Sequence, residues 1–362
     1  MKLLYITPKI NDEGGVQKVL SVRTNYFIEK FNYGIDILTQ NSGNKNLFFD
    51  FNKKIGFYDM ILSGNKISKI LNYRNEILKQ IAISKPDFVI ICDFGLKAFL
   101  IPFLIQTKIP IIFEAHGSIY NEPIAIKNSF AANILRKIKY KFRGFAAKKF
   151  DYFIALSKES LLEWNNKNGI VIPNPIENIS DKIALLENKK IIVVARHSYE
   201  KGIDRLLPIW DIVSKKYTDW QLNIYGKTDE NLEFNHLSNK KNINFLEPVK
   251  NINDKYLESS ICLMTSRSEA FPLVLLEAMS CGLPIIAYDC PIGPRAIIQN
   301  NENGFLIPDG NINLFAEKLS ELINNENLRK TIGQHAKISI EKYNIDAIMK
   351  TWNDLFLNLK KH

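Results

Sequence analysis

The sequence alternates between short apolar runs, rich in β-branched and aromatic residues, and longer segments with helical periodicity. In the first half the apolar runs lie at 2–7, 34–39, 87–92, 110–115 and 151–156. The helical candidates between them lie near 16–30, 65–84, 94–106 and 126–149. Strands that are apolar on both faces and alternate with helices are typical of a parallel sheet covered by helices on both sides.

The same alternation begins again after residue 190. The predicted strands there lie at 190–195, 220–225, 242–246, 261–265, 284–287 and 304–307. The predicted helices lie near 201–216, 252–259, 273–281, 293–299 and 311–324, and the tail from 326 to 358 is predicted to be helical throughout. We therefore predict an α/β fold of two doubly wound parallel-sheet domains in tandem.

The linker between the two domains is predicted in the segment 172–190, because Pro173 and Pro175 forbid a continuing strand or helix. Two such domains facing each other would form a cleft lined by the carboxyl ends of both sheets. Helix N-termini point their N–H groups and their positive dipole ends towards such a cleft. An anionic ligand is therefore expected there.

The charge of the chain is unevenly distributed. The 362 residues carry a formal net charge of +10, with 25 Lys and Arg against 14 Asp and Glu in residues 1–175 and 23 against 24 in residues 176–362. The excess in the first domain is compatible with nucleic acid, an anionic membrane or a phosphorylated substrate. A hydrophobic fraction of 46% and a charged fraction of 24% exclude wholesale disorder and a multi-span membrane protein.

No segment of the sequence predicts export or membrane insertion. The first thirty residues lack a secretory apolar core, and charges and prolines interrupt the apolar stretch near 88–113. We therefore expect a cytoplasmic protein. The cysteines show no C-x-x-C spacing, which favours buried reduced thiols over disulfides or a metal site; they are Cys92, Cys262, Cys281 and Cys290.

The segment 266–286 contains two carboxylates eight positions apart. Because proline is accepted only in the first turn of a helix, Pro272 predicts a helix that starts near it, with Glu269 in the preceding loop and Glu277 inside the helix. The N–H groups at this helix start could hold a phosphate or a sugar hydroxyl. The alternative is an ordinary capping acid and one exposed helix carboxylate.

Two cations follow a predicted buried strand, where Arg196 and Lys201 would suit a diphosphate. Gly226 ends another strand and permits a close backbone approach. The alternatives are two solvated surface cations and an ordinary turn glycine.

In the first domain Gly14 and Gly15 separate a strand from a helix, and His116 follows the strand 110–115. The glycine pair does not match G-x-G-x-x-G, so a tight loop near an anion or sugar is favoured over a nicotinamide site. A plain helix-entry turn and a packed histidine are the alternatives. If the strand continues that far, Glu114 beside His116 is expected to point to the opposite face.

These features occur together in a particular order along nearly the whole chain. The segments are Gly14-Gly15, EAHGS (114–118), IPNPI (172–176), ARHSYEKG (195–202), IYGKTDE (224–230), EAFPLVLLE (269–277) and AMSCGLPIIAYD (278–289). This arrangement resembles the GT-B glycosyltransferases, specifically the retaining enzymes of glycosyltransferase family 4. The segments 289–298 and 303–310 look most like bacterial enzymes of capsule, O-antigen and related lipopolysaccharide or polysaccharide assembly.

The resemblance implies Rossmann-like domains and a role for each candidate residue. Arg196 and Lys201 would bind the donor diphosphate, Glu277 the ribose, Glu269 the donor sugar, and His116 would lie near the reacting sugar. The remaining donor contacts would come from Gly14, Gly15, Gly226, Ala270, Phe271, Pro272, Leu273 and Val274. Relatives often have Glu where this chain has Ala296, so no carboxylate role is expected there.

The resemblance implies a hexosyltransferase that needs no metal and no cofactor besides its nucleotide-sugar substrate. The expected reaction moves a hexose or N-acetylhexosamine from a UDP-linked donor onto a polyprenyl-diphosphate-linked saccharide with retained configuration. The implied domains are an acceptor domain (1–175), a donor domain (176–340) and a C-terminal helix (341–362) that returns to the first domain. A GT-B sugar-nucleotide epimerase, a phosphorylase and a basic nucleic-acid-binding protein are the alternatives, although no nucleic-acid-binding motif is present.

The predicted helix 126–149 interleaves aromatic and aliphatic residues with cations, as in a helix that lies in a membrane interface. We therefore expect a peripheral protein on the inner face of the cytoplasmic membrane. The cations of this predicted face are Arg136, Lys137, Lys139, Lys141, Arg143, Lys148 and Lys149. The alternative is a helix that packs its apolar stripe on the sheet and leaves its lysines in water.

Overall fold

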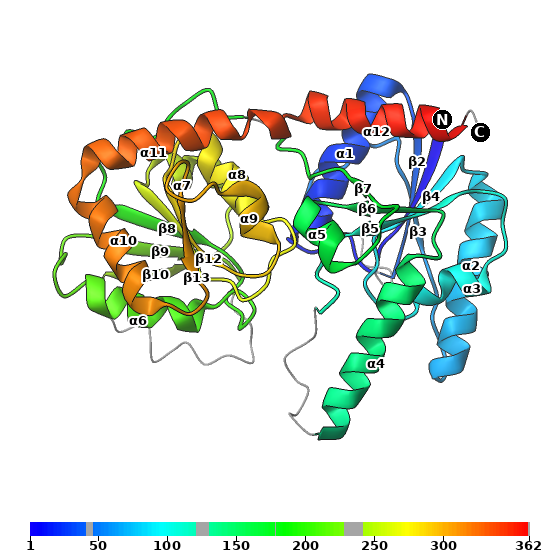
Figure 1. The fold of residues 1–362 in the computed structure, drawn as a ribbon. Helices are drawn as coiled ribbons and strands as arrows, with labels where there is room; N and C mark the ends of the chain where they lie inside the picture. Colours follow the sequence, from blue (N-terminus) through cyan, green and yellow to red (C-terminus); the bar gives the residue numbers. More distant parts are fainter. Residues whose placement is uncertain (41–45, 121–129, 178, 228–241, 361–362) are drawn as a thin grey trace. The chain divides into compact units, whose positions relative to one another are not determined.

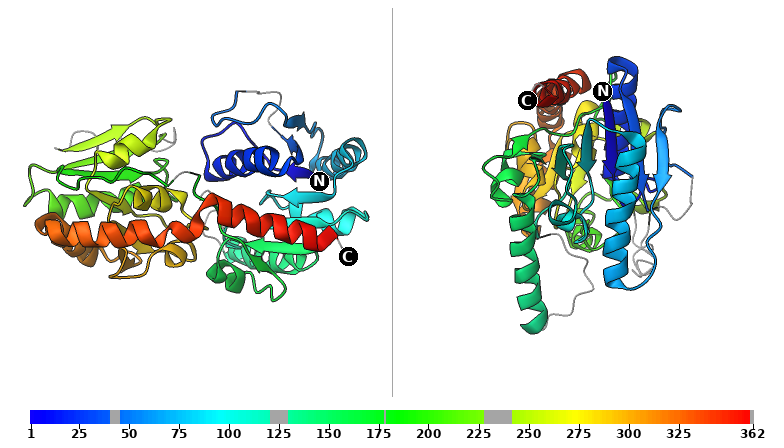
Figure 2. Two further views of the ribbon diagram at one scale, coloured as in Figure 1. Left: turned by 90° about the horizontal axis from the view of Figure 1, so that it is seen from above. Right: turned by 90° about the vertical axis from the view of Figure 1, so that its right-hand side faces the viewer.

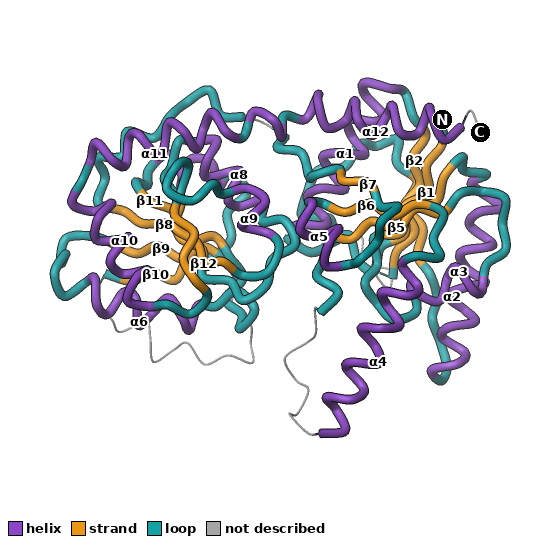
Figure 3. Tube along the Cα trace, viewed as in Figure 1, coloured by secondary structure: helices purple, strands orange, loops and turns teal. Residues whose placement is uncertain are grey.

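The computed structural model describes residues 1–40, 46–120, 130–177, 179–227 and 242–360. The chain divides into two compact units, unit 1 (residues 1–175 and 345–362) and unit 2 (residues 176–344). Each unit is built on one parallel sheet with helices on both of its faces (Figures 1 and 3). The predicted α/β fold of two doubly wound parallel-sheet domains is confirmed.

Unit 1 contains a seven-stranded sheet in the order β3-β2-β1-β4-β5-β6-β7. Its strands are β1 (Lys2–Ile6), β2 (Gly34–Thr39), β3 (Gly56–Asp59), β4 (Phe88–Ile91), β5 (Ile111–Ala115), β6 (Tyr152–Ala155) and β7 (Ile170–Val171). Its helices are α1 (Gly15–Phe31), α2 (Lys66–Ser84), a 3-10 turn (Ala98–Leu100), α3 (Ile101–Leu104), α4 (Phe130–Ala147), α5 (Lys158–Glu163) and α12 (Ile345–Lys360).

The strands of unit 1 bury alternate residues in two separate cores. On β1, Leu3 and Tyr5 face α1 and α12, whereas Leu4 and Ile6 face α2 and the segment around Phe99. This alternation follows from the two-residue period of a strand, and it explains why the strand sequences are apolar throughout.

Unit 2 contains a six-stranded sheet in the order β10-β9-β8-β11-β12-β13. Its strands are β8 (Lys190–Val194), β9 (Gln221–Tyr225), β10 (Ile243–Leu246), β11 (Ile261–Met264), β12 (Ile285–Asp289) and β13 (Phe305–Pro308). Its helices are α6 (Ile203–Val213), α7 (Ile252–Leu257), α8 (Leu273–Ser280), α9 (Gly293–Ile297), α10 (Ile312–Asn324) and α11 (Glu326–Ser339), followed by a 3-10 turn (Glu341–Tyr343).

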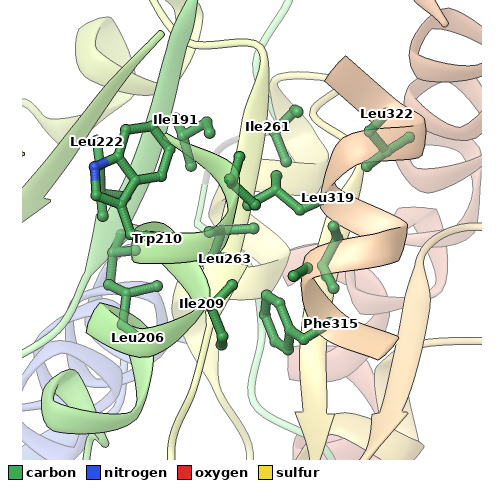
Figure 4. Close-up of a cluster of buried hydrophobic side chains, with 14 of the residues drawn as sticks. Ile191, Leu206, Ile209, Trp210, Leu222, Ile261, Leu263, Phe315, Leu319 and Leu322 are labelled. Carbon is green, nitrogen blue, oxygen red and sulfur yellow. The ribbon is translucent and has the colours of Figure 1, made fainter. Parts of the chain in front are cut away.

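One core of unit 2 lies between its sheet and the helices α6 and α10 (Figure 4). Trp210 of α6 and Phe315 of α10 belong to this core, together with Leu222 and Leu263 from the strands. All four cysteines of the chain are buried and free, as the sequence predicts.

Three short elements, β3, β7 and α5, were not predicted from the sequence. β3 is an edge strand whose residues 57–59 are exposed, and β7 has only two residues, so neither carries a buried apolar run. The predicted helix 94–106 is reduced to the 3-10 turn and α3. Residues 126–129 of the predicted basic helix, residues 228–230 of the segment 224–230 and residue 178 of the linker lie outside the described residues.

The helical tail is not continuous. α11 ends in unit 2, the 3-10 turn Glu341–Tyr343 follows, and α12 begins at Ile345 and belongs to unit 1. The returning helix therefore starts at 345 instead of 341. Within unit 2 the amide of Ile176 donates to the carbonyl of Tyr343 at 2.9 Å. This hydrogen bond joins the first residue of unit 2 to its end, since the unit spans residues 176–344.

No helix in the described ranges is long and apolar enough to cross a membrane.

We expect α12 to be essential for the stability of unit 1. Trp352 is 1% exposed and lies against Phe356 and over the guanidinium of Arg23. Trp352→Ala should lower the free energy of unfolding of unit 1 by about 3–5 kcal/mol because it leaves a large cavity. Urea denaturation followed by circular dichroism measures this loss.

Leu357→Ala is the control, because Leu357 lies on the same helix but is 44% exposed. Its effect should stay within about 0.5 kcal/mol. Equal unfolding curves for Trp352→Ala and the wild type would show that α12 is not part of the unit 1 core.

Candidate active site

The candidate site of unit 2 lies where the strand order of its sheet reverses. The chain runs outward from β8 to β9 and β10 on one side, then crosses back to β11 on the other side of β8 and runs outward to β12 and β13. Ligands of open parallel sheets bind beyond the carboxyl ends of the strands at such a switch point. The loop 195–202 after β8 and the loop 265–272 after β11 therefore lie next to each other at the expected position.

Lys201 and Glu269 come from these two loops and form an ion pair. The Lys201 Nζ lies 2.7 Å from the Glu269 Oε1, and the side chains are only 23% and 11% exposed. The Ser266 hydroxyl donates to the same carboxylate oxygen at 2.7 Å. The predicted diphosphate cation and the predicted sugar-binding acid are therefore in direct contact.

Arg267, which was not among the residues predicted from the sequence, holds the two loops together. Its guanidinium donates to both carboxylate oxygens of Asp204, at 2.7 and 2.6 Å, and to the carbonyl of Tyr199 at 2.6 Å. Its own amide donates to the carbonyl of Glu200 at 2.8 Å. Burial would raise the pKa of Asp204, but the Arg267 contact holds that pKa below its usual value. The sequence SRSEAF (266–271) could not predict this role, because the partners of Arg267 lie more than sixty positions earlier in the chain.

Two glycines allow the backbones around Lys201 to approach closely. At Gly202, where φ is 66°, a Cβ atom would lie 2.1 Å from the carbonyl oxygen of Thr265. At Gly226 a Cβ atom would lie 1.9 Å from the carbonyl oxygen of Ala195. Gly226 is thus required because its backbone packs against Ala195, at the start of the loop that carries Arg196. This requirement holds whether or not Gly226 contacts a donor.

Arg196 is more exposed than Lys201. Its side chain is 58% exposed, and its guanidinium lies 3.5 Å from the carboxylate of Glu200, four residues later. This position leaves most of the guanidinium in contact with solvent beside the carboxyl end of β8.

α8 begins at Leu273, directly after Pro272, so Glu269 lies in the loop and Glu277 in the helix as predicted. No side chain caps the start of this helix. Of the predicted contact residues, Phe271 is buried, Ala270, Leu273 and Val274 are partly exposed, and Pro272 is buried as the residue before the helix.

Glu277 lies in the middle of α8 and contacts Tyr256. The Tyr256 hydroxyl donates to Glu277 Oε2 at 3.4 Å and to the carbonyl of Val274 at 3.3 Å. Burial, and after it the Glu277 carboxylate, raise the pKa of Tyr256 well above its usual value. Tyr256 therefore stays protonated and keeps its hydroxyl as a donor at Glu277.

The turn before α9 packs against Glu269 and is strained. Ile292 has φ 79° and ψ −75°, a conformation that a β-branched residue rarely adopts. The amide of Gly293 donates to the carbonyl of Glu269 at 3.0 Å, and a Cβ atom on Gly293 would lie 2.8 Å from the Cβ of Glu269. Strain of this kind gathers at functional sites. Ala296 follows in α9, where its carbonyl accepts from the Tyr343 hydroxyl.

In unit 1 the strand order also reverses, between β1 and β4, and Gly14-Gly15 follows β1. Gly14 has φ −79° and caps α1 without a side chain. A Cβ atom there would meet only the flexible end of Gln17. The glycine pair therefore leaves the first turn of α1 open at the carboxyl edge of the sheet.

His116 follows β5 at the same edge, and its side chain is only 4% exposed. Its Nε2 lies 3.2 Å from the Glu114 Oε1, so the expectation that Glu114 points away from His116 is wrong. β5 ends at Ala115, and the amide of His116 donates to the carbonyl of Glu114 in a tight turn. In a strand, residues two positions apart point to the same face, so the two-residue period agrees with this contact and does not support the expectation.

Glu114 is fully buried and paired with Arg23 of α1. The guanidinium donates to both carboxylate oxygens, at 2.5 and 2.7 Å. Burial alone would raise the pKa of Glu114, but Arg23, with a smaller contribution from His116, holds that pKa well below its usual range. Glu114 is therefore ionised and lies in contact with the imidazole of His116. Neither Arg23 nor Glu114 was assigned such a role from the sequence.

Among the described residues, one group of side chains has a spacing that could hold a metal ion, namely Cys92, Glu114 and His116. The Arg23 guanidinium occupies both oxygens of Glu114. Burial, and next the Glu114 carboxylate, raise the pKa of the Cys92 thiol well above its usual value. A cation would compete with a buried guanidinium and a protonated thiol, so these residues do not fit a metal ion.

The predicted cationic face of α4 is only partly correct. Arg143 is buried and donates to the carbonyl of Ile119 at 3.0 Å, so it cannot meet a membrane or an acceptor. Lys148 and Lys149 follow the end of α4, at the amino edge of the sheet, and are exposed there. The remaining predicted cations, Arg136, Lys137, Lys139 and Lys141, lie on the part of α4 that projects from the unit.

We expect Glu114→Gln to destabilise unit 1 by about 3–5 kcal/mol, because it leaves the buried Arg23 without its counter-charge. Since the pKa of Glu114 is lowered in the folded protein, its stabilisation is complete above its unfolded pKa of about 4.3 and is lost as the pH falls below that value. The variant should therefore lose less stability than the wild type between about pH 7 and about pH 3. Urea unfolding at both pH values measures the difference.

The double variant Arg23→Met with Glu114→Gln is the control, because it removes both buried charges. It should recover part of the lost stability. A single Glu114→Gln variant as stable as the wild type at neutral pH would refute the buried ion pair.

Comparison with known proteins agrees with this geometry. The family "Glycosyl transferases group 1" matches residues 175–339. The amylovoran biosynthesis glycosyltransferase AmsD of Erwinia amylovora is 29% identical over 371 residues, which cover 98% of this chain and 99% of AmsD. An uncharacterized glycosyltransferase of Methanocaldococcus jannaschii is 30% identical over 266 residues, which cover 71% of this chain and 68% of that protein.

The solved structures show the same fold. TarM of S. aureus, crystallised with alpha-GlcNAc-glycerol and UDP, superposes with a TM-score of 0.77 at 17% identity, covering 98% of this chain and 99% of TarM. This likeness identifies the architecture as GT-B. With the family match in unit 2 and the relatives that span both units, we conclude that the chain belongs to the glycosyltransferases.

Proposed function

We propose that the protein is a retaining hexosyltransferase of glycosyltransferase family 4. It moves a hexose or N-acetylhexosamine from a UDP-linked donor to a lipid-linked saccharide in cell-surface polysaccharide biosynthesis of the capsule or O-antigen type. The observation that carries this proposal is the ion pair of Lys201 and Glu269 at the switch point of unit 2. It joins a cation suited to a diphosphate with an acid suited to sugar hydroxyls.

The chemistry follows from the charges that develop during transfer. Departure of the nucleoside diphosphate leaves negative charge on its phosphate and positive charge on the anomeric carbon. Lys201, Arg196 and the uncapped start of α8 supply positive charge and N–H donors at one edge of the sheet. These groups can stabilise the leaving group without a metal ion. The acceptor then attacks the front face, and the departing phosphate accepts its proton.

The remaining candidate residues have defined tasks in this proposal. Glu277, with Tyr256 beside it, accepts the ribose hydroxyls of the donor, and Glu269 accepts those of the sugar. His116, in contact with Glu114, assists the reacting sugar through hydrogen bonding. Gly14-Gly15 leaves the start of α1 open for the diphosphate.

The relatives support the donor and the pathway. AmsD is named for the biosynthesis of amylovoran, and TarM was crystallised with UDP. The TarM crystal also contains alpha-GlcNAc-glycerol, an alpha-glycoside, and transfer from an alpha-linked nucleotide sugar that gave an alpha-glycoside would retain the configuration. These facts support a UDP donor and a retaining reaction here.

A donor screen tests the proposal. UDP- and GDP-linked sugars are offered with one extract of lipid-linked oligosaccharides, and the products are analysed by mass. Gain of one hexose or N-acetylhexosamine on a lipid-linked acceptor is expected. Conversion of the donor without any acceptor would favour an epimerase, and consumption only with phosphate would favour a phosphorylase.

We expect Lys201→Ala and Arg196→Ala each to lower kcat by about 100- to 1000-fold, because each removes a cation from the leaving group. Both variants should fold, since Glu269 keeps the Ser266 hydroxyl and Arg196 is mostly exposed. Initial rates of donor turnover at saturating donor measure the effect.

Lys189→Ala is the matched control. Lys189 also pairs with an acid, Asp219, but it precedes β8 and so lies at the opposite edge of the same sheet. Its rate should equal that of the wild type. Near-normal transfer by both Lys201→Ala and Arg196→Ala would refute the assignment of the donor site.

We also propose that α4 holds the protein on the inner face of the cytoplasmic membrane. Its residues 130–142 contribute no buried side chain, and it carries no carboxylate. This supports the interfacial helix over a helix packed on the sheet. The exposed apolar side chains Phe130, Ile134, Leu135 and Ile138 would enter the headgroup region beside the cations.

Leu135→Ser with Ile138→Ser should lower sedimentation with vesicles that contain phosphatidylglycerol by about tenfold or more. Binding should also fall with added salt and on vesicles of phosphatidylcholine alone. Leu357→Ser on α12 is the control and should bind like the wild type. Vesicle binding that changes neither with the salt concentration nor with the anionic lipid content would refute the membrane contact of α4.

A further inference from the structure

A second helix of unit 1 projects in the same manner as α4. Residues 66–72 of α2 contribute no buried side chain, and the first buried residue of the helix is Tyr73. On α4 the first buried residue is Arg143, thirteen residues after the helix begins at Phe130. Both helices therefore have an N-terminal part that extends beyond the core of their unit.

The two projecting parts lie at the same edge of the sheet. In a parallel sheet each crossover helix starts where the preceding strand has ended, so its N-terminus lies at the carboxyl edge. Figure 1 and the right-hand view of Figure 2 show the lower ends of α2 and α4 extending past the sheet of unit 1 in the same direction. His116 and Gly14-Gly15 lie at this edge as well.

The projecting end of α2 has the chemistry of a membrane contact. Ile61, in the loop before α2, and Ile67 and Leu71 on its first two turns are 75%, 70% and 50% exposed. Lys66 and Lys69 lie beside them and are exposed, and residues 60–72 contain no carboxylate. Exposed apolar side chains interleaved with lysines complement an anionic membrane, because the apolar side chains can enter the acyl region while the lysines contact the anionic headgroups.

We propose that unit 1 docks on an anionic bilayer through two points, the N-terminal end of α2 (residues 61–71) and the N-terminal part of α4 (residues 130–142). This inference rests on the proposed membrane contact of α4 and adds a second anchor that fixes the tilt of the unit. One projecting helix leaves the unit free to rotate about it, whereas two points at one edge hold that edge against the bilayer. His116 and the start of α1 then face the headgroups, where the diphosphate of a lipid-linked acceptor lies.

Ile67→Ser with Leu71→Ser tests the second anchor. The full chain is sedimented with vesicles of phosphatidylcholine and phosphatidylglycerol, and we expect the partition coefficient to fall by about tenfold or more. Ile83→Ser is the matched control, because Ile83 lies on the same helix and is 57% exposed, but belongs to its last turn. It should bind like the wild type. Circular dichroism and thermal unfolding should be the same for all three proteins.

Quenching of tryptophan fluorescence by brominated lipids gives a second readout, because it reports whether a residue inserts into the bilayer and does not depend on binding affinity. The four natural tryptophans, Trp164, Trp210, Trp220 and Trp352, are at most 5% exposed, so lipids should not quench them. In Ile67→Trp, brominated phosphatidylcholine in the anionic vesicles should quench the added fluorescence. In Ile83→Trp it should not.

The outcomes separate this inference from the proposed function. If the α4 variant loses binding while Ile67→Ser with Leu71→Ser binds like the wild type and Ile67→Trp is not quenched, the second anchor is refuted and the α4 contact remains. If neither the wild type nor any variant binds anionic vesicles, both are refuted. Equal losses in Ile67→Ser with Leu71→Ser and in Ile83→Ser would also refute the anchor, because the effect would not belong to the projecting end.

Discussion

Parallel strand pairing is the constraint on which the rest of the structure depends. Each strand must be followed by a crossover that returns the chain, so the strand ends and the starts of the crossover helices that follow them gather at one edge of the sheet. In unit 2 this edge brings Lys201 and Glu269 into contact although 68 positions separate them. In unit 1 it gathers Gly14-Gly15, His116 and the projecting starts of α2 and α4.

The two units hold their candidate residues by different means. In unit 2, Arg267 and two glycines fix loops that leave the Lys201–Glu269 pair partly open to solvent. In unit 1, His116 rests on a buried ion pair, and α12 covers that pair through Trp352. The last helix of the chain therefore supports a residue whose strand precedes it by more than two hundred positions.

The cations of the first half of the chain divide into buried arginines and cations at the surface. Arg143 and Arg23 are buried and serve the structure, whereas the cations on the projecting parts of α4 and α2 remain in contact with solvent. Together with the exposed apolar side chains beside them, these cations supply the chemistry of the proposed membrane contact. Arg196 and Lys201, the proposed donor cations of unit 2, belong to a half whose charges nearly balance.

The sequence by itself determined the two parallel sheets, because apolar runs and helical segments alternate with clear periods, and it determined which loops carry Lys201, Glu269 and His116. It could not find β3 or β7, whose edge positions bury little, or the break at 341–344 in the helical tail. Only the tertiary structure decided that Glu114 contacts His116, that Arg267 joins two loops and that Arg143 is buried. Each of these facts depends on contacts between segments far apart in the chain, and local periodicity carries no information about such contacts.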